Sequence, residues 1–184
     1  MARALLIGLA TAAALAAGGA AADAAGSAPA KDEAVVRSAF PGTERVEIRD
    51  VLLTDDMVQR IERLARARVK ERLVTFYTAR RGGEVLGHAV IHSHVVRTKR
   101  ETLLLAFEPD GRIRKVTVLA FLEPQEYRPP ERWLRQLEGK GPADRLAVGD
   151  DLAPITGATL SARGIAEQSR WLLQALREAA GGRP

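Results

Sequence analysis

The chain has 184 residues, no cysteine and a formal net charge of +5, from 28 basic and 23 acidic residues. Without cysteine it has no disulfide, no cysteine nucleophile, no thiolate-held iron–sulfur cluster and no c-type haem attachment. So basic a chain first suggests nucleic-acid binding, but acidic residues are mixed with the arginines along most of the sequence. Together with the export signal described next, this mixing leads us to expect no nucleic-acid partner.

The N-terminus has the layout of a secretory signal peptide. A short positive segment (1–3) is followed by an apolar, alanine-rich run (4–17) and by two A-x-A patterns, at residues 20–22 and 28–30. The run is shorter than the roughly 20 apolar residues that a membrane span needs. We therefore expect residues 1–30 to be removed on export and the protein to be periplasmic or otherwise extracytoplasmic. An uncleaved leader that anchors the protein to the membrane is the alternative.

Residues 31–184 are enough for one domain with a sizeable core, and their first part, to about residue 70, is predicted to be a mainly helical extension. A short helix is expected over residues 32–39, capped by Asp32, and a strand over 46–51. A second helix is expected over 55–69, capped by Thr54 or Asp55. Its inner face would carry Met57, Val58, Ile61, Leu64, Ala65 and Val69.

A β meander follows, in which apolar residues alternate with polar ones. The expected strands are 73–79, 85–96, 101–107 and 113–121, with tight turns at 81–84 and 109–112. A proline-containing loop then leads to a short helix over 130–138. A terminal helix over 161–178 places Ile165, Ser169, Leu172, Leu173 and Leu176 on its inner face. The predicted fold class is α+β: an antiparallel β meander packed against helices and closed by the C-terminal helix.

The segment from Thr156 to Ser161 carries the main functional signal. Hydroxyl side chains alternate there with small residues just ahead of the terminal helix. A helix N-terminus offers unpaired N–H groups and a positive dipole end, and both favour a phosphate. Thr159 also supplies an alcohol that phosphate could esterify. The alternative is that Thr159 or Ser161 is an ordinary N-cap beside a flexible glycine.

This segment resembles the Ser/Thr-Gly-Ala-Thr-x-Ser/Thr flavinylation motif of the FMN-binding domain family. That family includes the FMN-bearing subunits of sodium-translocating NADH:quinone reductase and of the Rnf complexes, and small secreted flavoproteins. The order of elements over roughly residues 70–180 is also similar to that domain. The resemblance implies that an FMN transferase, using FAD, joins FMN to Thr159 through a phosphoester. The resemblance also implies that five residues line the phosphate end of the FMN: Thr156, Gly157, Ala158, Leu160 and Ser161.

One position departs from the family pattern. The motif usually has an acidic residue three positions before its first hydroxyl, and this chain has Ala153 there, with Asp150 and Asp151 slightly upstream. The departure bears on covalent attachment more than on FMN binding. The sequence thus predicts FMN as the cofactor and leaves open whether it is covalent or dissociable.

Three further residues are expected beside the flavin. The resemblance places Glu123 and Tyr127 in a loop against it, although the prolines of that loop could simply stiffen a surface segment. His94 is the best candidate for a hydrogen bond to the ring. His88, His92 and His94 share one strand face, but the ends of this series are about 20 Å apart. Since no further ligands complete a set of four, we expect no metal site.

No catalytic residue is expected, because no nucleophile elbow, Walker motif or dinucleotide-binding glycine pattern occurs. Electrons would therefore reach the flavin from another protein. The sequence predicts an FMN-binding electron-transfer protein that relays electrons between a membrane redox complex and another periplasmic carrier or reductase. Two alternatives stay open: a flavin-dependent reductase of a small acceptor, and a binding module of the same fold without cofactor.

Overall fold

The computed structural model describes residues 27–181. In chain order it contains α1 (Ser27–Ala39), β1 (Arg45–Leu52), α2 (Asp55–Ala65), β2 (Leu73–Arg81), β3 (Glu84–Val95), β4 (Arg100–Phe107), β5 (Ile113–Phe121), η1 (Gln125–Tyr127), α3 (Glu131–Leu134), η2 (Arg135–Leu137) and α4 (Thr159–Ala179). Apart from its last four residues, the predicted leader lies outside the described residues. Within the described part, no helix is both long and apolar enough to cross a membrane.

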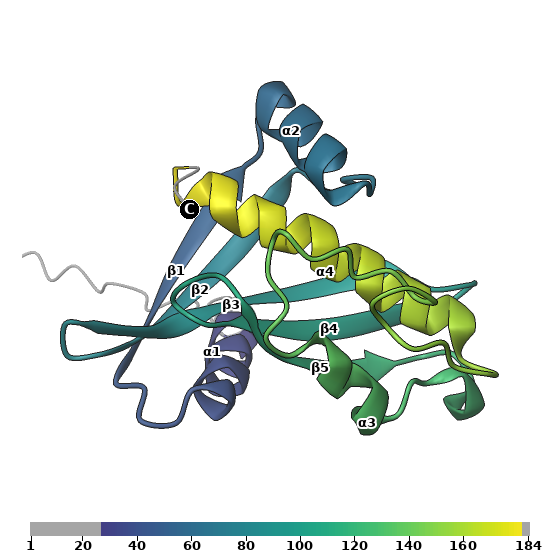
Figure 1. Cartoon of the computed structure of the whole chain (residues 1–184). Helices are drawn as coiled ribbons and strands as arrows, with labels where there is room; N and C mark the ends of the chain where they lie inside the picture. The colour runs from purple at the N-terminus through teal and green to yellow at the C-terminus, as the bar shows by residue number, and fades with distance from the viewer. Residues whose placement is uncertain (1–26, 182–184) are drawn as a thin grey trace, which may run out of the picture.

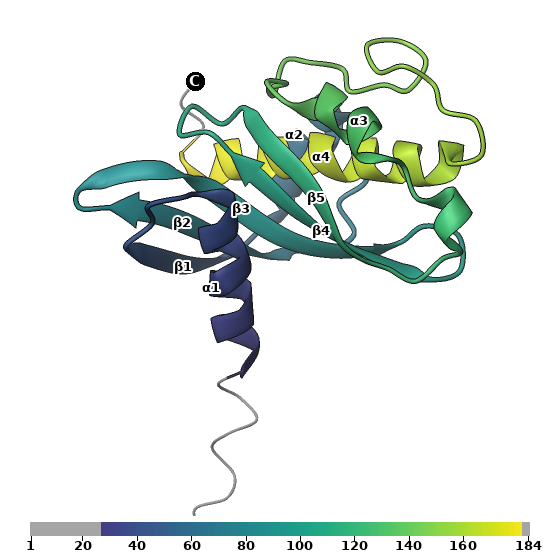
Figure 2. The same ribbon diagram turned by 90° about the horizontal axis from the view of Figure 1, so that it is seen from below.

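A five-stranded antiparallel sheet in the order β1-β2-β3-β4-β5 forms the centre of the molecule (Figure 1). Helix α4 runs across one face of the sheet, and α1 packs on the opposite face (Figure 2). The predicted α+β class, with a β meander and a closing helix, is confirmed. Strand β1 forms one edge of the sheet and α2 packs against α4, so the stretch before residue 70 is built into the core.

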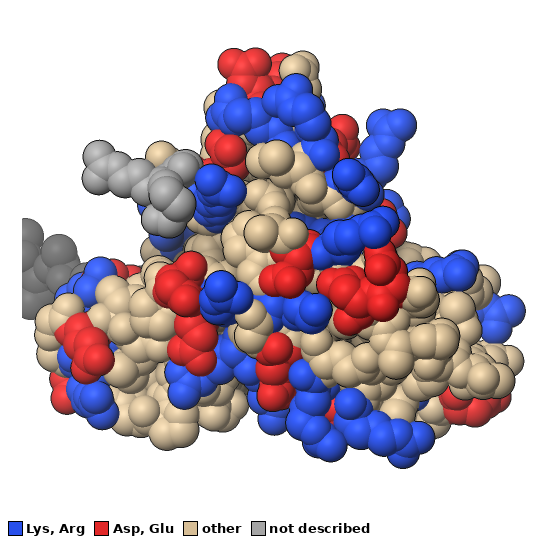
Figure 3. All heavy atoms as spheres, in the orientation of Figure 1, with Lys and Arg blue, Asp and Glu red and all other residues tan. Residues whose placement is uncertain are grey.

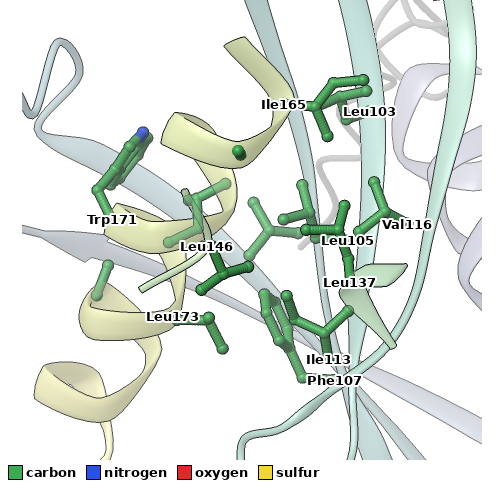
Figure 4. Close-up of a cluster of buried hydrophobic side chains, with 14 of the residues drawn as sticks. Leu103, Leu105, Phe107, Ile113, Val116, Leu137, Leu146, Ile165, Trp171 and Leu173 are labelled. Atoms are coloured by element: carbon green, nitrogen blue, oxygen red, sulfur yellow. The ribbon is translucent and has the colours of Figure 1, made fainter. Parts of the chain in front are cut away.

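The two faces of the sheet bury alternate residues of the same strands, as the two-residue period of a strand requires. In β4, the side chains of Leu103, Leu105 and Phe107 belong to the core under α4, whereas Leu104 and Ala106 belong to the core under α1. Figure 4 shows the larger core, with apolar side chains of α4 facing those of β4 and β5. Sheet residues on the α4 face therefore lie directly beneath the helix that follows the motif.

Helix α2 begins as predicted and ends early. The Thr54 hydroxyl accepts a hydrogen bond from the Met57 amide at 3.3 Å, which confirms the expected cap. The helix stops at Ala65 because Arg66 takes the left-handed conformation, with φ of 49°. The prediction that it runs to residue 69 with Leu64 on its inner face is wrong. The Leu64 side chain is 54% exposed.

Helix α1 is longer than predicted, and Asp32 is not its cap. The helix begins at Ser27, so Asp32 lies inside it. The Asp32 carboxylate accepts a hydrogen bond from the Tyr77 hydroxyl of β2 at 3.0 Å. Burial and this bond raise the pKa of Tyr77 to about 12. The contact ties α1 to the sheet, a role that the local sequence does not reveal.

Two C-terminal boundaries also differ from the prediction. The single helix expected over 130–138 is a short α-helix, α3, that tightens into the 3-10 turn η2. Helix α4 begins at Thr159, two residues before the predicted start. Thr159 is therefore a helical residue.

Replacement of Gly87 by alanine should destabilise the fold. A Cβ atom at this β3 position would overlap both the Phe40 ring, just after α1, and the Phe107 carbonyl oxygen of β4. Because a backbone atom cannot easily move aside, we expect Gly87→Ala to lower the free energy of unfolding by about 2–3 kcal/mol in urea titrations. The matched control is Gly83→Ala in the β2–β3 turn, where a Cβ meets nothing within 4 Å. Equal stability of the two variants would contradict the packing described here.

Candidate functional site

The motif lies where the long loop after η2 turns into α4. Thr156 and Gly157 are exposed, and Gly157 has a φ of 85°, a left-handed conformation that favours glycine. A Cβ on Gly157 would sit 4.0 Å from the carbonyl oxygen of Glu126, which places the motif against η1. Tyr127 is the next residue of η1. The structure thus brings the motif to the same end of the molecule as the loop that the sequence associates with it.

Among the described residues, no side chain caps the N-terminus of α4. Its N-cap residue is Ala158, whose carbonyl oxygen accepts from the Ala162 amide at 2.9 Å. The Thr159 hydroxyl donates backwards to the Ile155 carbonyl oxygen at 2.7 Å. The capping interpretation of Thr159 or Ser161 is therefore wrong. No acidic side chain occupies the first turn, so the positive end of the helix is not neutralised from within it.

The three residues of the first helical turn differ in exposure. Thr159 is half-buried, Leu160 is 52% exposed and Ser161 is 1% exposed. The Ser161 Oγ atom is buried and has no hydrogen-bond partner within the described residues. The first turn thus carries two hydroxyls: that of the half-buried Thr159, which is bonded to Ile155, and that of Ser161, which is enclosed and has no partner among the described residues.

Glu123 is engaged by backbone amides. Its Oε1 atom accepts hydrogen bonds from Thr98 at 2.7 Å, Lys99 at 2.8 Å and Arg97 at 3.2 Å. These bonds, that from Thr98 foremost, lower the pKa of Glu123. The buried carboxylate therefore ties the segment after β5 to the β3–β4 turn. Its predicted place beside a flavin stays a prediction.

Tyr127 lies close to the same turn. The guanidinium of Arg97 sits 4.9 Å from the centre of the Tyr127 ring, within cation–π distance. Arg97 therefore contacts both of the loop residues that the sequence analysis singled out, one through its amide and the other through its side chain. The role of Tyr127 as a flavin neighbour also stays a prediction.

His94 is buried beneath α4, one turn beyond the motif. Its Nε2 atom lies 3.3 Å from Glu101 Oε2 on β4, in a geometry that makes no hydrogen bond. A Cβ on Gly164 would be only 3.0 Å from the same nitrogen, so the missing side chain of Gly164 permits the close approach. His94 thus faces the helix rather than solvent. Its hydrogen bond to a flavin ring stays a prediction.

His92 continues this polar strip along the helix. Its ring stacks on that of His94, with centroids 6.1 Å apart, and meets Trp171 edge-on at 5.2 Å. The Gln168 Oε1 atom lies 3.1 Å from His92 Nε2 and accepts from Trp171 Nε1 at 2.7 Å. Since Gln168 Oε1 can only accept, His92 carries its proton on Nε2.

Burial keeps the His94–Glu101 pair uncharged. It lowers the pKa of His94 to about 4 and raises that of Glu101 to about 8. The sequence analysis missed Glu101, Gly164 and Gln168. Alternation along β4 could have found Glu101, because it shares a face with the buried Leu103 and Leu105.

The histidines do not assemble a metal centre. His88, His92 and His94 do share the α4-facing side of β3, as expected from their spacing. His88, however, contacts Thr78, with 3.0 Å between its Nδ1 atom and the threonine hydroxyl. In the described part of the chain, no group of three or more histidine, aspartate or glutamate residues could hold a metal ion.

The acidic residues upstream of the motif have other partners. Asp151 accepts from the amides of Leu146 and Ala147 at 3.0 and 2.6 Å, and Asp150 pairs with Arg145 at 2.5 Å. Ala153, at the usual acidic position, is exposed. Neither aspartate therefore takes the place of the missing carboxylate.

The two cavities that we describe lie away from the motif. Their volumes are about 560 and about 500 Å³, and both are lined by the C-terminal half of α4 and by the loop at Pro142. No motif residue lines either of them. Leu173, which lines both cavities, lies about 21 Å from Thr159 along the axis of α4. The motif and the cavities are thus separate features.

No protein-family model matches the chain, and a search of curated proteins finds no match.

Loss of the Glu101 carboxyl should change the pH dependence of stability. Between pH 4.5 and about 8 the folded protein holds a Glu101 proton that the unfolded chain has lost, so the free energy of unfolding falls as pH rises. The lowered pKa of His94 has the opposite effect between about 4 and 6.5, which leaves Glu101 dominant from pH 6.5 to 8. Between pH 6.5 and 8 we expect the free energy of unfolding of wild type to fall by about 1–2 kcal/mol and that of Glu101→Gln to stay constant.

Urea unfolding at half-unit pH steps measures this difference. Glu138→Gln, which removes an exposed carboxylate, is the control and should follow wild type. A wild-type curve that is flat between pH 6.5 and 8 would mean that Glu101 is already ionised in the folded protein.

Proposed function

We propose that the chain is an extracytoplasmic FMN-binding electron-transfer protein, with FMN joined to Thr159 through a phosphoester. The observation that carries the proposal is the geometry of Thr159. Its half-buried hydroxyl stands in the first residue of a 21-residue helix whose N-cap is Ala158. Because no side chain caps the helix, its first amide groups and positive dipole end remain available to a phosphate.

The residues of the motif suit the phosphate end of such a group. The left-handed Gly157 and exposed Thr156 leave room in front of the helix, and the first turn has no carboxylate to repel an anion. Ser161, in the same turn, has a hydroxyl without a partner among the described residues, and we expect it to donate to a phosphate oxygen. Ala158, Leu160 and Gly157 would line the site without adding charge.

Attachment requires Thr159 to give up one hydrogen bond. Its hydroxyl now donates to the Ile155 carbonyl oxygen, and an ester oxygen has no proton to donate. In the transferase reaction that the motif implies, a bond forms between Thr159 Oγ1 and the FMN phosphorus of FAD. The pyrophosphate bond breaks, AMP leaves, and the threonine proton is released.

The redox partners in this proposal are proteins. FMN accepts and donates one or two electrons, and the protein supplies attachment and electrostatic surroundings. The chain has no glycine-rich nicotinamide-binding motif. We therefore infer that a membrane redox complex delivers the electrons and that another periplasmic carrier or a reductase takes them up. Maturation needs an FMN transferase, and an uncleaved leader would hold the protein at the membrane.

Intact mass measurement of the protein exported together with an FMN transferase tests the attachment. Wild type should gain the mass of FMN less one water after denaturation. Thr159→Val keeps the shape of the side chain and removes the hydroxyl, so it should gain nothing. Thr159→Ser keeps the hydroxyl and should still be modified, and peptide mapping should place the group on residue 159.

Other results would favour the alternatives. An unmodified but yellow wild type would show dissociable FMN. An unmodified and colourless protein would contradict the flavoprotein proposal and favour a binding module. Saturable, repeated reduction of a small acceptor by the loaded protein would favour a reductase.

Restoring a carboxylate at residue 153 should raise the modified fraction. Ala153 is exposed. Its backbone amide donates to the Gln136 side chain and its backbone carbonyl accepts from the Trp133 side chain. Because a new side chain leaves these backbone groups in place, Ala153→Asp should fold normally. At limiting transferase, we expect the ratio of modified to unmodified mass to increase over wild type. Ala147→Asp, in the same loop, is the control. An equal or lower ratio for Ala153→Asp would show that the transferase does not need this carboxylate.

A further inference from the structure

The cavity of about 500 Å³ at the C-terminal end of α4 has the size of a small-molecule site. It lies on the α4 side of the sheet, between β1, β2 and β3, the β4–β5 turn and the last turns of α4. Register explains why these residues meet: Arg49 pairs with Phe76 and Thr78 pairs with His88, so their side chains line adjacent rows on one face.

The wall of the cavity is mainly apolar. Phe76 from the sheet and Leu173 and Leu176 from the helix supply side chains that are 1–8% exposed overall, and Pro109 and Pro142 close the sides. Such a wall favours an apolar ligand body, since each square ångström removed from water contributes about 25 cal/mol.

The polar groups of the cavity favour an anion. Arg49 and Arg177 both line it, and neither forms an ion pair within the described part of the chain. Among the residues that the structure describes, Arg49 donates only to the Ala179 carbonyl oxygen, at 3.3 Å. The one carboxylate among the lining residues is that of Asp110. It accepts a hydrogen bond from the Arg112 backbone amide at 3.0 Å and forms an ion pair with the Arg112 guanidinium at 3.6 Å.

The third polar element is the His88–Thr78 pair. The threonine hydroxyl occupies His88 Nδ1, which leaves Nε2 without a hydrogen bond among the described residues. Burial, foremost, and the nearby Arg80 lower the pKa of His88, so the ring is neutral at pH 7. A neutral imidazole nitrogen can donate to or accept from a ligand without adding charge.

We propose that this cavity binds a small organic anion with an apolar body and a single carboxylate or sulfonate group, which Arg49 and Arg177 recognise. The site is independent of the Thr159 motif, which lies about 21 Å away along the helix. Its occupant enters from solvent and needs no flavin. Figure 3 shows charges of both signs mixed over this side of the molecule, so the selectivity comes from the cavity and not from the overall surface.

Fluorescence titration with 8-anilinonaphthalene-1-sulfonate tests the proposal, with the uncharged N-phenyl-1-naphthylamine as a comparison. Wild type should bind the sulfonate saturably at one site. The double variant Arg49→Gln, Arg177→Gln should bind it about tenfold more weakly and bind the neutral probe unchanged. The control Arg63→Gln, Arg68→Gln removes two exposed charges outside the cavity and should match wild type with both probes. Equal binding by all three proteins would overturn the proposal.

Competition then identifies the ligand body. Displacement of the probe by decanoate indicates an aliphatic acid, and displacement by naphthalene-1-carboxylate indicates an aromatic one. If neither carboxylate displaces the probe, the proposal that the cavity binds small organic anions is wrong.

Amide chemical shifts of the wild-type protein locate the probe without any substitution. The amides of Gly111, Ala143 and Ala180 should move in proportion to saturation, because these residues line the cavity. Shifts confined to residues 156–161 would place the probe at the motif and overturn the cavity assignment. This result would leave the mass test of Thr159 unaffected.

Discussion

Burial of α4 against one face of the sheet holds this structure together. The chain has no cysteine, so no covalent link supports the fold, and the helix must stay in place by packing. Twelve of its residues are buried, among them Ile165, Trp171 and Leu172. A large apolar side chain contributes about 1.5–3 kcal/mol when fully removed from water. The same packing fixes where the helix begins, and hence where Thr159 stands relative to η1.

The helix also covers buried polar groups, which reduce the stability gained by packing it on the sheet. His94, Glu101 and Ser161 are buried with unpaired polar atoms, and such atoms each cost free energy. These three residues lie near the N-terminal half of α4, beside the motif. The C-terminal half packs on apolar residues such as Phe107 and contains one such atom, Gln174 Oε1. Gly164 lets the helix approach His94 closely. Strained or unsatisfied groups of this kind are common at functional sites, and three of the four described residues that carry them lie near the start of α4, where we propose a site.

In our proposals the two ends of α4 serve different chemistry. At its start, an uncapped N-terminus and a threonine hydroxyl suit a phosphate that is covalently held. At its end, apolar walls and two arginines that form no ion pair among the described residues suit a dissociable organic anion. A rigid helix of 21 residues keeps these regions apart, so occupation of one does not require the other.

The sequence by itself determined the strands, the turns and the presence of most helices, because alternation, helical periodicity and Pro-Gly signals act over a few residues. It also placed Thr159 and Ser161 at a helix start. Only the tertiary structure decided that Asp32 bonds to Tyr77, that Glu123 binds the turn at Thr98, and that Glu101 faces His94. It likewise decided that α2 stops at Ala65, where Arg66 turns the chain. The Asp32–Tyr77 and Glu123–Thr98 contacts join residues 45 and 25 positions apart, and the Glu101–His94 contact depends on the register of β4 against β3. The end of α2 depends on a single backbone angle. Local patterns carry no information about which partner on another element a polar side chain meets.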